Sequence, residues 1–186
     1  RAHRQITAYS SADLLKEMDE GGVDAAVIHP PGWDPTGGAL AIEAASQHPN
    51  RLAILGNFPL DQESSHGLVG NWKQQAGMLG LRFTFQQPHM QTWLTDGTMD
   101  WLWSAASQAG LPVALAAAAI IPSVGEVAEK HPDVKLIIDH LGRAGGTTDA
   151  ECFANLSDML ALAKYPNVAI KASGAPSYSS GPYPFT

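Results

Sequence analysis

Val134-Lys135-Leu136-Ile137-Ile138-Asp139-His140 is an apolar run that ends in two polar residues. The tag His131-Pro132-Asp133 precedes it, and proline at such a position stops a helix and disfavours helical geometry in the residue before it. Consecutive apolar residues, here Leu136-Ile137-Ile138, are typical of a strand that is buried on both faces of a parallel sheet. The stretch therefore predicts a buried strand with reactive side chains at its C-terminal end.

The same unit recurs along the chain. Two further apolar runs follow very similar tags, His48-Pro49-Asn50 and Tyr165-Pro166-Asn167. Six such runs are predicted as strands, at residues 23–28, 52–55, 79–83, 111–115, 134–138 and 168–170. Segments of helical periodicity separate them, at residues 11–20, 40–47, 61–75, 99–108, 124–130 and 154–164, and the segment 61–75 is the least periodic.

Strands that alternate with helices predict an α/β protein with a parallel sheet. The strand starts recur about every 29 residues, close to the roughly 31 residues per unit of a (β/α)8 barrel. An open doubly wound sheet is the alternative, but it would normally have a glycine-rich phosphate loop after its first strand. Here that strand is followed by His29-Pro30-Pro31-Gly32-Trp33. We therefore predict an incomplete TIM barrel, with residues 1–186 as a single partial domain.

Composition excludes several classes of function. The net charge of −7 is spread along the chain without a Lys/Arg-rich block, which argues against nucleic acid as a partner. No apolar run approaches the roughly 20 residues of a membrane span. Cys152 is the single cysteine, so we interpret it as a helix residue and expect a reducing, cytoplasmic setting. The oligomeric state is not indicated.

Polar residues at the C-terminal ends of barrel strands are the candidates for an active site. Asp139 and His140 end the fifth run, and because side chains alternate along a strand, one is expected to point into the barrel mouth and the other away. A neutral imidazole in the mouth can bind a metal or polarise a substrate carbonyl. The alternative is a structural histidine bonded to a loop carbonyl.

Arg82 and Thr84 lie on one face of the third run, and Leu81, Phe83 and Phe85 lie on the other. A guanidinium on the inner face near the mouth can hold a substrate carboxylate with two hydrogen bonds. The alternative is an internal salt bridge to a neighbouring strand. Because Asp139 is the only acid at another strand end, we favour an anionic ligand.

Several other residues share these strand ends. Lys171 follows the sixth run, in phase with Ser173, and is expected either to stabilise charge in the reaction or to pair with an acid on a further strand. His29 and Asn57 either line the pocket or only shape their loops. The loops also carry aromatic residues suited to the walls of a pocket for a small planar substrate, namely Trp33, His89, Trp93 and Tyr178.

Three of these stretches are similar to known signatures. Residues 79–83, 136–142 and 167–174 resemble the strand-4, strand-6 and strand-7 signatures of the amidohydrolase-2 family, in the same order. This family comprises metal-dependent hydrolases of TIM-barrel fold, which include lactonases for pyrone-dicarboxylate, sulfomuconolactone and sugar lactones, and some decarboxylases. The resemblance implies that the six runs are strands 2–7 of the barrel and that the sequence is truncated at both ends.

The resemblance also implies a division of roles. His140 matches the strand-6 histidine, a metal ligand where one divalent metal (zinc or manganese) is used, and Arg82 matches the carboxylate-binding arginine of the pyrone lactonases. The family's strand-1 His-x-His pair would precede Arg1, and its strand-8 aspartate would follow Thr186. Metal-using members often have a histidine at the end of strand 5, where this sequence has Ala116-Ala117-Ala118-Ala119.

Three functions follow as hypotheses. In the first, the intact protein hydrolyses a small carboxylated lactone or cyclic ester. Arg82 would hold the carboxylate, and His140, with Asp139 and Lys171 beside it, would serve catalysis. The substrate would also contact His29, Asn57, Thr84, Ser173 and Tyr178. The second is a metal-dependent decarboxylase on the same scaffold, and the third is that this chain alone is an inactive fragment.

Overall fold

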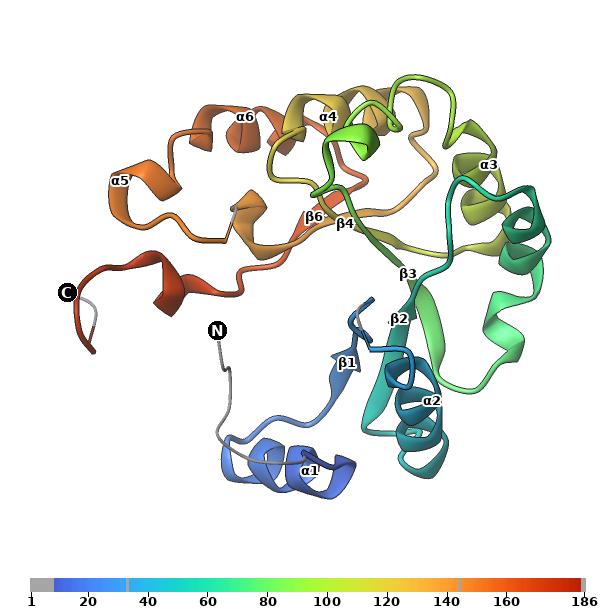
Figure 1. Cartoon of the computed structure of the whole chain (residues 1–186), viewed down its shortest axis with the longest axis vertical. Coiled ribbons are helices and arrows are strands. Elements are labelled where there is room, and N and C mark those ends of the chain that lie inside the picture. Colours follow the sequence, from blue (N-terminus) through green and yellow to red (C-terminus); the bar gives the residue numbers. More distant parts are fainter. Residues whose placement is uncertain (1–8, 33, 144, 185–186) are drawn as a thin grey trace.

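The computed structural model describes residues 9–32, 34–143 and 145–184. Six parallel strands form one sheet in the order of the sequence, and the sheet curls into part of a barrel with helices on its outer side (Figure 1). This confirms the predicted incomplete TIM barrel. The strands are β1 (Ala26–Ile28), β2 (Leu52–Gly56), β3 (Met78–Thr84), β4 (Val113–Ala116), β5 (Leu136–Ile138) and β6 (Val168–Ile170).

The α-helices follow the predicted pattern with shifted ends. They are α1 (Ser11–Glu20), α2 (Gly37–Gln47), α3 (Asp100–Ala109), α4 (Ile121–Lys130), α5 (Asp149–Cys152) and α6 (Leu156–Ala161). The single helix expected at 154–164 is instead α6 followed by a 3-10 turn, η4 (Leu162–Lys164). None of the described helices is long and apolar enough to cross a membrane.

Four further 3-10 segments lie outside these elements, namely η1 (Glu63–Gln74), η2 (Pro88–Met90), η3 (His140–Gly142) and η5 (Ala175–Tyr178), which follows the last strand. The segment expected to be helical at 61–75 is thus a long 3-10 helix. Gly67 and Gly70 lie within it, and glycine weakens regular helix because it loses the most backbone entropy on folding.

Local interactions explain where elements begin and end. Ser10 caps α1 in a reciprocal capping box with Asp13, which satisfies backbone donors that the first helical turn leaves free. Asn167 in the third proline tag binds the carbonyls of Ala128, His131 and Val134 at 3.1–3.2 Å. Its amide has two N–H donors for three acceptors, so one bond is shared. Asn167, which directly precedes β6, therefore links the start of that strand to the end of α4 and to the residues before β5.

The apolar core lies between the outer face of the sheet and the helices. On β3, Leu81 and Phe83 are 0% and 4% exposed, and Phe85, which follows the strand, is 1% exposed, which confirms the predicted outer face. They belong to a large cluster with residues of α3, α4 and α6. A smaller cluster joins α1 and α2 to β1 and β2. Because this core fills the outer side, Arg82 and Thr84 are left for the inner face.

Strand register brings four inner-face residues to one level at the barrel mouth. Thr84 of β3 is aligned with Ala116 of β4. Leu115 of β4 is aligned with Ile138 of β5, and Ile138 with Ile170 of β6. The next residues along, Ala116, Asp139 and Lys171, therefore share the level of Thr84. Neighbouring parallel strands place such side chains on the same side of the sheet.

Candidate active site

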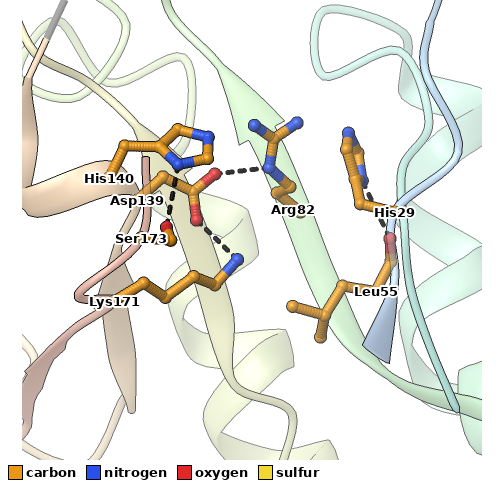
Figure 2. Close-up of polar contacts among 7 residues, drawn as sticks. All are labelled: His29, Leu55, Arg82, Asp139, His140, Lys171 and Ser173. Atoms are coloured by element: carbon orange, nitrogen blue, oxygen red, sulfur yellow. Dashed lines mark hydrogen bonds and ion pairs between the residues drawn. The ribbon is translucent and has the colours of Figure 1, made fainter. Parts of the chain in front are cut away.

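A buried carboxylate joins three strands at the barrel mouth. Asp139 Oδ2 accepts a hydrogen bond from Arg82 Nε at 2.5 Å, and Oδ1 lies 2.6 Å from Lys171 Nζ (Figure 2). The Asp139 side chain is 1% exposed, against 12% for Arg82 and 36% for Lys171. The site thus contains two cations that share one anion.

The pKa of Asp139 reflects a balance of two effects. Desolvation by burial alone would raise this pKa, but the contacts with Lys171 and Arg82 outweigh it and hold the pKa below its ordinary value. Asp139 is therefore an ionised structural anion, poorly suited to take a proton because each of its oxygens lies in an ion pair with a cation. Arg82 therefore makes an internal salt bridge, which was the alternative to the favoured anionic ligand. Lys171 pairs with Asp139 and not with an acid on a further strand.

His140 follows Asp139 but does not point away from the mouth. Its φ of 52° is left-handed, so the strand alternation ends there, and both residues line the same pocket. The expectation that one of them would point away was wrong for this reason. The ring Nδ1 of His140 lies 2.9 Å from Ser173 Oγ (Figure 2). Ser173 thus orients the imidazole.

Two residues fix the backbone around His140. The Tyr178 hydroxyl donates to the carbonyl of His140 at 3.0 Å, with the Ser173 carbonyl at 3.3 Å. The Tyr178 side chain is buried, and this burial raises the pKa of its phenol. Gly142 has a φ of 64°, and a Cβ there would lie 2.3 Å from Met159 Sδ. The turn after Asp139-His140 therefore requires glycine.

His29 lies on the other side of Arg82. Its Nδ1 is 3.0 Å from the Leu55 carbonyl, which can only accept, so Nδ1 carries the proton and Nε2 has a free lone pair (Figure 2). Burial lowers the pKa of His29 below its ordinary value, against the opposing effect of the Leu55 hydrogen bond. His29 is thus a neutral imidazole at pH 7, able to accept a proton or bind a metal.

Two pockets meet at Arg82. The larger, about 490 Å³, is lined by residues that include Asp139, His140 and the alanine run 116–119. The smaller, about 250 Å³, is lined by His29, Asn57 and Thr84, with Trp93 and Phe58 as aromatic walls. His89 packs edge-on against Trp93 at 5.6 Å between ring centroids, and Trp33 lies outside the described residues. The predicted residues His29, Asn57 and Thr84 therefore line one compartment, and Asp139 and His140 line the other. Lys171, Ser173 and Tyr178, which were also predicted for the site, line neither of the two.

Arg143 is a feature that the sequence analysis missed. It lines the larger pocket and is 5% exposed. Its Nε and Nη1 donate to the carbonyls of Leu141 and Cys152 at 2.7 and 2.8 Å, while its Nη2 is buried without a hydrogen-bond partner in the described structure. The ion pairs among the described residues include no carboxylate for it. Its position three residues after His140 was the one sequence feature that could have pointed to a place in the site. Its burial could not be read from the sequence.

A metal centre is not assembled by the described residues. No group of three or more His, Cys, Asp or Glu side chains converges among them. His29 and His140 each offer one ring nitrogen, the oxygens of Asp139 are held by Arg82 and Lys171, and β4 ends in alanine. A zinc or manganese ion needs several such ligands. This donor set does not fit a metal.

Solved structures share this fold. An amidohydrolase from Burkholderia multivorans, solved with HEPES and separately with zinc, superposes with a TM-score of 0.78 at 18% identity, over 92% of this chain and 62% or 61% of that protein. A probable 2-pyrone-4,6-dicarboxylic acid hydrolase from Acinetobacter baumannii, solved with citric acid, gives 0.69 at 17% identity, over 98% and 67%. The chain thus spans less than two thirds of the Burkholderia protein's length.

A third neighbour has a different activity. The 5-carboxyvanillate decarboxylase from Novosphingobium aromaticivorans, solved with manganese and a nitrobenzoic acid, gives a TM-score of 0.56 at 14% identity, over 85% of this chain and 57% of that protein. No curated protein matches the sequence. The family model for amidohydrolases matches residues 1–185, nearly the entire sequence. Together with the barrel strands and their order, this match shows that the chain belongs to the amidohydrolase family.

Proposed function

We propose that the intact protein hydrolyses a small lactone or related cyclic ester that carries a carboxylate. The observation that carries this proposal is the pair of guanidinium groups in the larger pocket. Asp139 holds Arg82 through Nε alone, and the two terminal amino groups of Arg82 point away from that contact (Figure 2). Arg143 is buried with no carboxylate partner in the described part of the chain. A buried cation of this kind favours an anionic ligand.

The side chains around Arg82 suit the other parts of such a substrate. His140, oriented by Ser173, is placed to donate a hydrogen bond to the ester carbonyl, where negative charge develops during attack by water. His29 is neutral and presents a free Nε2 on the opposite side of Arg82. Asp139 and Lys171 act by positioning, because each is committed to the ion pair.

The relatives are consistent with a carboxylated substrate. The Acinetobacter protein is described as a probable pyrone-dicarboxylic acid hydrolase and binds citric acid, which is itself a polycarboxylate. The decarboxylase from Novosphingobium, also similar in fold, supports a second candidate, decarboxylation of a small aromatic acid. The alanines at the end of β4, where metal-using members of the family often have a histidine, favour hydrolysis over the metal-dependent decarboxylase.

Turnover by the intact protein distinguishes these proposals. We expect hydrolysis of carboxylated lactones, measured through the proton that each turnover releases. The kcat/KM should be at least 100-fold above that for the same lactones in which the carboxylate is converted to a methyl ester. Release of carbon dioxide from aromatic acids without lactone hydrolysis would favour the decarboxylase instead. Equal rates for charged and uncharged lactones would contradict the role of the arginines. Turnover by residues 1–186 alone would exclude the hypothesis that this chain is an inactive fragment.

A further inference from the structure

The two pockets beside Arg82 differ in size and in the side chains that form them. The compartment toward β4 and β5 measures about 490 Å³ and the one toward β1 and β2 about 250 Å³. Sites for small molecules commonly measure about 300–1,000 Å³. The larger compartment alone is within that range, so it is the one that can enclose most of a ligand.

Four consecutive alanines form one wall of the larger compartment. Ala116–Ala119 line it between the residues that follow β3 and those that follow β5. The neighbouring strand ends carry longer side chains at this level, Thr84 on β3 and Asp139 directly after β5. Because each alanine contributes one methyl group, the position of this wall is set by the backbone.

Hydrogen bonds hold that backbone in place. The carbonyl of Ala116 accepts from Phe85 N at 3.0 Å, and that of Ala117 from Ile120 N at 2.9 Å. The carbonyl of Ala118 accepts from Asn155 Nδ2 at 3.1 Å. The wall is therefore fixed on both sides, and the space in front of it is a lasting feature of the fold.

We propose that Ala116–Ala119 form a specificity-determining wall, which directs the larger part of a carboxylated ligand to the β4–β5 side of Arg82. This inference rests on the proposed function. Arg82 borders both compartments and fixes the carboxylate, so the free volume decides on which side the ring system lies. Besides Arg82 and Asp139, the polar lining there includes Gln86, Gln91 and Arg143 beside His140. These donors suit a ring system with hydrogen-bond acceptors, such as a lactone.

Two carboxylated lactones of different size test the wall in the intact protein. Coumalate has one ring and coumarin-3-carboxylate has two fused rings. In Ala118→Leu and Ala119→Leu, we expect the Kd of the two-ring acid to rise at least tenfold and that of the one-ring acid to change less than twofold. Ala119 is exposed, so its variant tests the wall even where Ala118→Leu fails to fold. Ala163→Leu, an exposed site on η4, is the matched control and should change neither Kd.

The outcomes separate the two proposals. If the Kd rises equally for both acids, or for neither, the proposed role of the alanine wall is overturned, while the proposed binding of a carboxylate is not. If neither acid binds to the unmodified protein, the proposed function fails and the wall fails with it. A selective loss for the one-ring acid would show that the two-ring acid does not depend on the larger compartment and would also overturn the inference.

Discussion

Arg82 Nε and Asp139 Oδ2 are 2.5 Å apart, although their strands, β3 and β5, are separated by β4. Adjacent strands lie about 4.8 Å apart, so the pair spans two such spacings. It can do so because β4 presents Ala114 and Ala116 at the levels of Arg82 and Thr84. The alanines of β4 therefore permit both the ion pair and the larger pocket.

Removal of the shared anion should destabilise the fold. Asp139→Asn leaves Arg82 and Lys171 close together without a counter-ion, and loss of one partner of a buried pair costs about 3–5 kcal/mol. We expect about 3 kcal/mol because Lys171 is 36% exposed and solvent screens part of the charge. Urea unfolding at pH 7 measures this, with the exposed Asp158→Asn as control. A loss below about 0.5 kcal/mol would refute a structural role for Asp139.

The same carboxylate makes the fold sensitive to acid. Its pKa is lowered in the folded state, so its contribution is complete above the unfolded value of about 3.9 and is lost as the pH falls through the folded pKa. As the pH falls below about 4, the free energy of unfolding should therefore decline more steeply in the parent chain than in Asp139→Asn. Parallel curves for the two proteins would contradict this assignment.

His29 should be neutral and protonated on Nδ1 at pH 7. Burial lowers its pKa, so it should titrate below the ordinary value of about 6.5, and its contribution to stability should be lost as the pH falls below that value. Nitrogen-15 NMR of the imidazoles reports both the tautomer and the pKa. A proton on Nε2 would be inconsistent with the Leu55 hydrogen bond, and titration at or above the ordinary value would contradict the effect of burial on the ring.

Ser173→Ala should release His140. Loss of the 2.9 Å contact with Nδ1 removes one hydrogen bond, worth about 1 kcal/mol, at an exposed ring. We expect a small change in stability, a shifted His140 resonance and at least a tenfold fall in kcat with little change in KM. Ser157→Ala, exposed on α6, is the control. An unchanged kcat would show that the orientation of His140 does not matter.

Gly142→Ala should disturb the turn that carries His140. The left-handed backbone costs about 1–2 kcal/mol with a Cβ, and the clash with Met159 Sδ adds an overpacking cost of about 1–3 kcal/mol. The cost of the clash should disappear in the double variant Gly142→Ala/Met159→Ala, once the effect of Met159→Ala alone has been subtracted. Gly145→Ala, where a Cβ meets nothing within 4 Å, should have little effect on stability. Equal effects at both glycines would contradict the packing argument.

Strand order and the polar edge could be predicted because both depend on local pattern. The proline tags and apolar runs marked six strands, and alternation placed Arg82 and Thr84 opposite Leu81 and Phe83. The partners of the charges could not be predicted, since the pairing of Arg82 with Asp139 depends on the small side chains of an intervening strand. The left-handed turn at His140 and the burial of Arg143 are likewise tertiary effects.

Binding of a carboxylated lactone to Arg82→Lys tests the central claim most directly. Lysine keeps the charge beside Asp139 but lacks the two free amino groups of the guanidinium. We predict that the Kd of coumalate rises at least tenfold in the intact protein, while the free energy of unfolding changes by less than about 1 kcal/mol. An unchanged Kd in a stably folded variant would show that Arg82 only holds the fold together and does not bind the ligand.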